Sequence, residues 1–286
     1  MVGETVDSHV HLWDARHTPQ PWMTSEHEAI NRPFGPEDIA PLLARNAIDR
    51  IIVVQGACLD SDTDYLFEEA ARSEWIGAVI TWVRLDDPHR AAARLDGLSV
   101  RPKFRGVRHL THNEPAHSIL QPLVLESVAT LEERDLILEL PVVWPRHFDA
   151  VVNLSARFPR LRIVIDHLGK LPIGTPEMVR WADALATAAD FPNVFAKVSG
   201  FNTALDEPNW TISDLRPSVE TALACFGPDC LMCGSDWPYS LLNGEFDRVW
   251  GLTSQALAEG GPGAADRLLG GNARHVYRFA DLPGTS

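Results

Sequence analysis

A regular alternation of short apolar segments with longer amphipathic segments constrains this chain more than any other feature. Eight apolar segments rich in valine and isoleucine are expected as strands, at residues 6–13, 50–56, 76–83, 104–110, 136–142, 161–169, 193–200 and 230–238. Eight amphipathic segments are expected as helices, at residues 36–47, 62–73, 88–98, 122–134, 145–158, 177–189, 213–226 and 245–259, and two short helices follow near 264–269 and 273–279. Strands that are apolar throughout are typical of parallel sheets covered on both faces.

This order of elements predicts an α/β fold made of eight βα units. The glycine fingerprint of an open dinucleotide-binding sheet does not follow the first strand, and no repeat of solenoid length occurs. We therefore predict a single (β/α)8 TIM barrel. Such a barrel takes about 250 residues, so we expect the whole chain, residues 1–286, to form one domain.

The charge and the distribution of apolar residues exclude several classes of partner. The formal net charge is −14 and the sequence contains no run of lysine or arginine, so we expect no binding to nucleic acid. A secretory signal and an apolar run of about 18 residues, the length of a membrane span, are both missing. A soluble, cytoplasmic protein that does not contact membranes is therefore expected.

The cysteines are too few and too unevenly spaced to form a disulfide framework in a chain of this size. Cys230 and Cys233 have the spacing of half a zinc site, but no second pair completes it, and both fall in an expected strand. We expect these two residues to be free thiols of the core.

A His-x-His pair, His9 and His11, lies in the first expected strand, which begins at residue 6. Side chains two residues apart point to the same face of a strand, so His9 and His11 are expected to converge, with Val6, Ser8 and Val10 facing the other way or lying deeper. Strands one and eight are neighbours in a closed barrel, which brings Asp236 to the same place. Two imidazoles and a carboxylate suit a divalent metal ion.

The active site of a (β/α)8 barrel lies at the carboxyl ends of its strands, so polar residues there are the candidates for function. Besides the residues named above they are Gln55, Trp82, Arg84, Arg108, His109, Glu139, Asp166, His167, Lys197, Ser199 and Ser235. His167 is expected either to ligate the metal or to hydrogen-bond a bound water. For Asp236 the alternatives are a helix N-cap and a partner for a nearby histidine.

Four segments of the chain resemble the amidohydrolase superfamily, and within it the lactonase-like branch. They are VDSHVHLWD at 6–14, FRGVRHL at 104–110, VIDHLGK at 164–170 and CGSDWP at 233–238, in this order. That branch includes sugar-lactone hydrolases such as fuconolactonases and rhamnonolactonases, 4-sulfomuconolactone hydrolases and 2-pyrone-4,6-dicarboxylate lactonases. The resemblance covers about residues 5–280.

The resemblance implies a role for five residues of this sequence. His9 and His11 match the metal ligands of the first strand, His167 matches the histidine of the sixth, and Asp236 matches the aspartate of the eighth strand that activates water. Arg108 matches the arginine of a Gly-Val-Arg motif and is implied to hold the carbonyl or carboxylate of the substrate. His167 and Asp236 thus count both as catalytic residues and as metal ligands.

Departures from the superfamily pattern bear on the metal. Many members bridge two metal ions with a carboxylated lysine after strand four and add a histidine on strand five, where this chain has Arg108, His109 and Glu139. We therefore expect one divalent ion, with zinc the first choice, and not a binuclear centre. Some members of the branch use no metal, which remains the alternative.

The implied reaction is the hydrolysis of a small lactone, either a sugar aldonolactone or a related carboxylated lactone, which places the protein in carbohydrate metabolism. Asp236 would take a proton from water and return it to the ring oxygen, and His167 would orient that water. Expected substrate contacts are Arg108, Trp82, Arg84 and Trp237. The sequence leaves open which lactone is cleaved, the roles of Glu139, Lys197 and His109, and whether a homo-oligomer forms.

Three other functions remain as alternatives. A metal-dependent decarboxylase of an aromatic or unsaturated acid uses the same histidines and aspartate, a ligand-binding barrel would have no activity, and an amide hydrolase faces a poorer leaving group. Residues 14–35 are expected as a lid or binding loop. Trp13, Trp22 and Trp210 are expected either to stack on substrate or to pack in the loops, and His112, His117 and Arg146 to lie at the surface.

Overall fold

The computed structural model describes residues 3–201, 204–205, 209–259 and 263–279. It contains one sheet of eight parallel strands that follow the order of the chain. The strands are β1 (Val6–Val10), β2 (Arg50–Val54), β3 (Ile76–Thr81), β4 (Phe104–Arg108), β5 (Ile137–Leu140), β6 (Arg162–Ile165), β7 (Val194–Val198) and β8 (Leu231–Cys233). The structure confirms the predicted (β/α)8 barrel.

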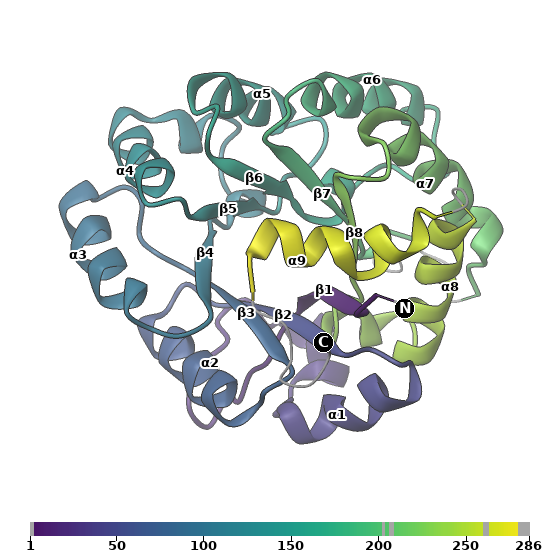
Figure 1. Cartoon of the computed structure of the whole chain (residues 1–286), viewed down its shortest axis with the longest axis horizontal. Coiled ribbons are helices and arrows are strands. Elements are labelled where there is room, and N and C mark those ends of the chain that lie inside the picture. The colour runs from purple at the N-terminus through teal and green to yellow at the C-terminus, as the bar shows by residue number, and fades with distance from the viewer. Residues whose placement is uncertain (1–2, 202–203, 206–208, 260–262, 280–286) are drawn as a thin grey trace.

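Helices surround the strands, as Figure 1 shows. They are α1 (Pro36–Arg45), α2 (Asp60–Arg72), α3 (Pro88–Ser99), α4 (Pro122–Glu133), α5 (Phe148–Arg157), α6 (Met178–Ala189), α7 (Ile212–Phe226), α8 (Phe246–Ala258) and α9 (Asn272–Tyr277). Local signals fix their starts: proline occupies the first turn of α1, α3 and α4, and Asp87 caps α3 by accepting a hydrogen bond from the backbone of Arg90.

The barrel is closed between β1 and the segment that follows β8. The backbone N–H of Asp236 donates to the carbonyl of His9 at 2.9 Å, and the N–H of His11 donates to the carbonyl of Trp237 at 2.7 Å. These two bonds bring the carboxylate of residue 236 beside both histidines of β1.

A bulge in β1 departs from simple strand alternation. Asp7 pairs with Ile51 and Val10 pairs with Val53, so β1 has one more residue than β2 between these pairs. As a consequence Val6 packs inside the barrel and Val10 packs against the helices. Both valines therefore follow the prediction, since Val6 lies deeper in the barrel and Val10 faces away from the two histidines; the extra residue is what changes the face between them.

All eight strands end earlier than predicted, and the difference is largest for β6 and β8. β6 stops at Ile165 instead of 169, and β8 stops at Cys233 instead of 238. His167 and Asp236 lie beyond these ends with left-handed backbone, at φ of 54° and 60°. Non-glycine residues adopt this conformation rarely and often at functional sites. The left-handed turns end both strands and place the two side chains at the mouth of the barrel.

Helix α9 closes the opposite end of the barrel. It crosses the centre of the view in Figure 1, and its Val276 and Tyr277 pack against inward-facing apolar residues of the strands such as Val6, Ile52 and Ile137. Apolar side chains fill this floor, and the polar inward-facing side chains of β4 to β7 lie above it. The open end of the barrel is therefore the mouth formed by the carboxyl ends of the strands.

The cysteines are free, and Cys233 is buried as predicted. Cys230 is only partly buried, because it lies just before β8 at the rim of the floor. Within the described ranges, none of the helices has the length and apolar character that crossing a membrane requires.

Candidate active site

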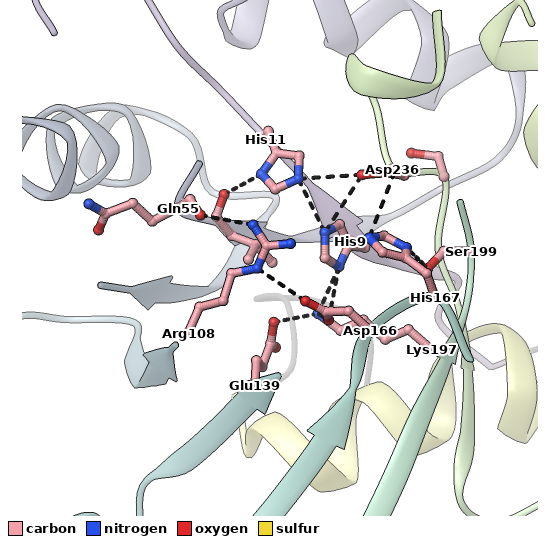
Figure 2. A network of polar contacts seen from close by, with 12 residues as sticks. His9, His11, Gln55, Arg108, Glu139, Asp166, His167, Lys197, Ser199 and Asp236 are labelled. Carbon is pink, nitrogen blue, oxygen red and sulfur yellow. Dashed lines mark hydrogen bonds and ion pairs between the residues drawn. The ribbon is translucent and has the colours of Figure 1, made fainter. Parts of the chain in front are cut away.

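The mouth holds a group of polar side chains supplied by seven different strands or strand ends, all but β3 (Figure 2). His9 and His11 lie at β1, and Asp236 follows β8. Their atoms are close: Nε2 of His9 lies 3.2 Å from Nε2 of His11, and Oδ1 of Asp236 lies 3.7 Å and 3.4 Å from these two nitrogens. The structure thus brings together the three residues that the sequence analysis placed at one side of the mouth.

His167 joins this group from the end of β6. Its Nε2 lies 3.9 Å from Oδ2 of Asp236, and its Nδ1 is hydrogen-bonded to the hydroxyl of Ser199 at 2.9 Å. Gly200 makes room for the ring, since a Cβ at that position would lie 2.7 Å from Nδ1. We call His9, His11, His167 and Asp236 the histidine–aspartate cluster.

The orientation of the imidazoles fits a metal ion. Nδ1 of His11 donates to the carbonyl of Val54 at 2.6 Å, so its Nε2 carries the lone pair. Nδ1 of His167 is held by Ser199 and Nδ1 of His9 faces Asp166, which leaves Nε2 of each ring directed toward Asp236. Ring nitrogens whose other nitrogen is held by the protein are typical metal ligands. Ligand atoms of His9, His167 and Asp236 all lie within 4.8 Å of one another.

The charge states of the cluster also suit metal binding, which requires neutral histidine and ionised aspartate. Burial lowers the pKa of His9 and of His167, so that both are neutral near pH 7. Burial raises the pKa of Asp236, but the nearby His167, His11 and His9 more than offset this and leave that pKa below its ordinary value.

A second buried group lies behind His9. The ammonium of Lys197, from β7, lies 2.7 Å from Oε2 of Glu139, 3.2 Å from Nδ1 of His9 and 3.6 Å from Oδ1 of Asp166. The hydroxyl of Tyr277, from α9, donates to Oε1 of Glu139. We call Lys197, Glu139, Asp166 and Tyr277 the lysine cluster. None of these four side chains is accessible to solvent.

Arg108 links the lysine cluster to the mouth. Its Nε donates to Oδ2 of Asp166 at 3.1 Å, and its Nη1 donates to the carbonyl of Gln55 at 3.2 Å. Burial raises the pKa of Asp166, but His9, Lys197 and Arg108 together hold it well below its usual range. Arg108 is 7% exposed. Its Nε and Nη1 each donate one hydrogen bond within the protein, and its other N–H groups are not used in these two bonds.

The remaining expected substrate contacts lie in different surroundings. Trp82 is half-buried beside the end of β2, where its backbone N–H donates to Oε1 of Gln55 at 2.8 Å. Arg84 has a side chain that is 61% exposed and pairs with Asp86 at 2.7 Å. Trp237 is buried and packs edge-on against Phe34 at 5.2 Å between ring centres. The structure therefore places the backbone of Trp82 beside Gln55 at the mouth, whereas Arg84 pairs with Asp86 at the surface and Trp237 packs against Phe34.

The loop that was expected to cover the mouth carries a small group of aromatic rings. Trp22 lies 5.3 Å from His27 and 6.0 Å from Tyr239 between ring centres, and all three are half-buried. Tyr239 comes three residues after Asp236. Trp13 and Trp210 are buried and pack in the core, so Trp22 is the one of these three tryptophans that keeps an exposed face.

Sequence reasoning missed several polar residues near the mouth. His112 was expected at the surface but is half-buried, and burial together with the charges of Lys170 and Arg108 lowers its pKa to about 4. His117 and Arg146 are exposed as expected. Lys170 was not singled out, although its charge acts on Asp236 and on Arg108.

His109, whose role the sequence left open, is held away from the histidine–aspartate cluster. Its Nε2 pairs with Glu114 at 3.1 Å in the loop after β4, and this contact holds the pKa of Glu114 down at about 2. The adjacent Arg108 points inward, because side chains alternate along a strand. Arg108 therefore contacts Asp166 inside the barrel, whereas His109 contacts Glu114 in the loop.

Comparison with known proteins agrees with this geometry. The family model described as Amidohydrolase matches residues 6–279. The L-fucono-1,5-lactonase of Burkholderia ambifaria is 36% identical over 279 residues, which are 96% of this chain and 95% of that protein. The L-fucono-1,5-lactonase of Burkholderia multivorans is 32% identical over 289 residues, or 96% of each chain.

A solved structure extends the likeness to the fold as a whole. The crystal structure of an amidohydrolase from Burkholderia multivorans with bound zinc has a TM-score of 0.89 and 28% identity, and the match covers 97% of this chain and 100% of that one. Family model, relatives and structure agree over nearly the full length. The chain belongs to the amidohydrolase family.

Proposed function

We propose that this protein is a lactonase that opens a small lactone of the sugar aldonolactone type. The observation that carries the proposal is the convergence of Nε2 of His9 and His11 with the carboxylate of Asp236, within 3.7 Å, in a chain 36% identical to an L-fucono-1,5-lactonase. Lactone hydrolysis needs an activated water, a polarised carbonyl and a proton for the departing ring oxygen. The site offers one group for each need.

Asp236 is proposed as the base and then the acid. Its carboxylate is ionised because the three histidines around it lower its pKa more than burial raises it. It accepts a proton from the attacking water and returns it to the ring oxygen as the tetrahedral intermediate breaks down. His167, 3.9 Å from the second carboxylate oxygen, is placed to orient that water.

The histidine–aspartate cluster is the proposed site of one divalent metal ion, with zinc as the first choice. A divalent ion bound there would lower the pKa of a bound water toward about 7 and would polarise a carbonyl oxygen. The support is the donor set of three imidazole nitrogens and one carboxylate, in which Nδ1 of His11 is already bonded to the protein.

Arg108 and Trp82 are proposed as substrate contacts. The guanidinium of Arg108 is fixed by Asp166 and by the carbonyl of Gln55, which holds its other N–H groups ready for an oxygen of the lactone. The backbone of Trp82 is bonded to Gln55, and its half-buried side chain is the proposed stacking partner of a sugar-like ring. Trp22 is the corresponding candidate on the mouth loop.

Decarboxylation of an aromatic or unsaturated acid is the rival reaction on this scaffold. It would use the same histidines and aspartate. Both relatives described above are lactonases, however, and each matches 96% of this chain. The proposal includes that the protein is a single-domain cytoplasmic enzyme of carbohydrate metabolism, since its expected substrate is a sugar lactone.

A panel of substrates tests the proposal. The purified protein is assayed with a pH indicator against L-fucono-1,5-lactone, other aldonolactones and carboxylated lactones, and carbon dioxide release is followed with hydroxybenzoate-type acids. We expect acid production from at least one aldonolactone, its loss after treatment with a chelator, and its return when zinc is added. Turnover of hydroxybenzoates with no lactone opened would overturn the proposal in favour of the decarboxylase.

A further inference from the structure

Two sets of metal-ligand atoms meet at His9. One is formed by His9, His167 and Asp236, and the other by His9, Glu139 and Asp166, and the atoms of each set lie within 4.8 Å of one another. The two sets use opposite sides of the same ring: Nε2 of His9 faces Asp236, and Nδ1 faces Asp166 at 3.3 Å. By donor chemistry alone, both positions suit a cation.

The second position already holds a cation that belongs to the chain. Nζ of Lys197 lies within 3.6 Å of a ligand atom of all three members of that set: 2.7 Å for Glu139, 3.2 Å for His9 and 3.6 Å for Asp166 (Figure 2). Oδ1 of Asp166 is buried and accepts no hydrogen bond from any described residue, and its close polar neighbours are Nδ1 of His9 at 3.3 Å and Nζ of Lys197 at 3.6 Å.

Formal charges balance around this ammonium. Glu139 and Asp166 contribute two negative charges, and Lys197 and Arg108, which pairs with Asp166 at 3.1 Å, contribute two positive charges. The sum is zero without a metal ion. Taking away the lysine leaves one uncompensated carboxylate in a site that water does not reach, and such a charge is costly unless a cation or a proton neutralises it.

We propose that Lys197 is a built-in cation that restricts the site to one metal ion, by occupying the position between His9, Glu139 and Asp166. Lys197 is thus a positioning residue: it contacts the far nitrogen of a metal ligand and fills a place that a second ion would take. The inference rests on the proposed metal-dependent function, but it concerns the number of ions bound and not the reaction.

The stability of the fold does not by itself explain a buried lysine at position 197. Burying a charged pair seldom stabilises a protein more than apolar residues of the same volume would. The other two lysines of the chain are not enclosed in this way: Lys103 bonds to the carbonyls of Ala70 and Ser73, and Lys170 is exposed at the mouth. The ammonium that contacts a metal-ligand histidine is therefore the one placed to limit metal binding.

The test is a count of zinc ions per chain. Wild type, Lys197→Met, the double variant Lys197→Met/Glu139→Gln and the control Lys103→Met are dialysed against zinc at pH 8, where free carboxyl groups are ionised, and measured by elemental analysis. We expect one ion for wild type and the control, two for Lys197→Met, and one for the double variant, in which the excess negative charge is removed. Circular dichroism verifies that each protein is folded.

Several results would overturn the inference. They are a folded Lys197→Met protein that still binds one ion, a double variant that binds two, and a wild-type count of zero or two. If Lys197→Met does not fold, Lys197→Gln carries the same expectation. Wild-type crystals soaked in excess zinc give an independent reading: we expect no anomalous peak among His9, Glu139 and Asp166, and a peak there would contradict the proposal. Absence of lactone turnover would refute the proposed function without changing the expected counts.

Discussion

The two sides of the His9 ring differ in how completely the protein satisfies them. On the inner side, the lysine cluster pairs its carboxylates with an ammonium, a guanidinium and a tyrosine hydroxyl, all buried. On the outer side, the ion-pair partners of Asp236 among the described residues are three histidines, none of which needs to be charged. A polar group whose partners all come from the protein stabilises the fold. A polar group that lacks some of its partners is available to bind a ligand.

Replacing Asp236 with asparagine should have the largest effect, because it removes the proposed base from the outer side of the His9 ring. We expect a loss of about 100-fold or more in kcat for the lactone, the range for a positioned general base. Initial rates measured at saturating substrate test this. The thermal unfolding curve should change little, since the lysine cluster is untouched, and near-normal turnover would show that another group takes the proton.

Replacing Glu139 with glutamine should act mainly on stability, because it breaks the completed side. The ammonium of Lys197 would lose its charged partner at 2.7 Å and keep the carboxylate of Asp166 at 3.6 Å and Nδ1 of His9 at 3.2 Å. We expect the free energy of unfolding to fall by about 3 kcal/mol, the lower end for breaking a buried ion pair. Urea denaturation measures this.

A matched ion pair at the surface provides the control for that loss. Glu259 pairs with Arg216 at 2.8 Å, and both side chains are more than 40% exposed. Because solvent screens such pairs, Glu259→Gln should leave the urea midpoint unchanged within error. If Glu139→Gln and Glu259→Gln shift the urea midpoint equally, the burial of the lysine cluster does not explain the loss of stability in Glu139→Gln.

Replacing Tyr277 with phenylalanine should be the milder of the two changes to the lysine cluster. The change removes the hydroxyl that donates to Oε1 of Glu139 and leaves the ring packed in the floor. A buried acceptor without its donor costs about 1 to 3 kcal/mol, and zinc binding should stay at one ion because the ammonium remains. Urea denaturation and zinc analysis of the same sample check both parts; a gain of a second ion would show that Tyr277, and not Lys197, limits the site.

The histidine–aspartate cluster could be predicted from sequence because its signals are local. His9 and His11 are two residues apart on one strand, and Asp236 follows the strand that must meet it when the barrel closes. The barrel itself follows from the alternation of apolar and amphipathic segments. These inferences need the periodicity of apolar residues and the order of the strands, and both can be read from the sequence.

The lysine cluster could not be assembled in the same way. Glu139 and Lys197 stand out as charged residues inside apolar strands, but no spacing indicates that they pair, or that Tyr277 reaches them from the floor helix. The bulge in β1 and the left-handed turn at Asp236 depend on contacts between strands and shift positions that alternation alone assigns. Trp237 was expected at the substrate, but it follows that turn and packs in the core.

The most direct measurement is an anomalous difference map at the zinc absorption edge from crystals grown with zinc. The account predicts one peak, bonded to Nε2 of His9 and of His11 at about 2.0 to 2.1 Å and to the carboxylate of Asp236 at about 2.0 to 2.2 Å, the distances usual for zinc. A peak on the Nδ1 side of His9, or zinc bound only outside the barrel mouth, would contradict it.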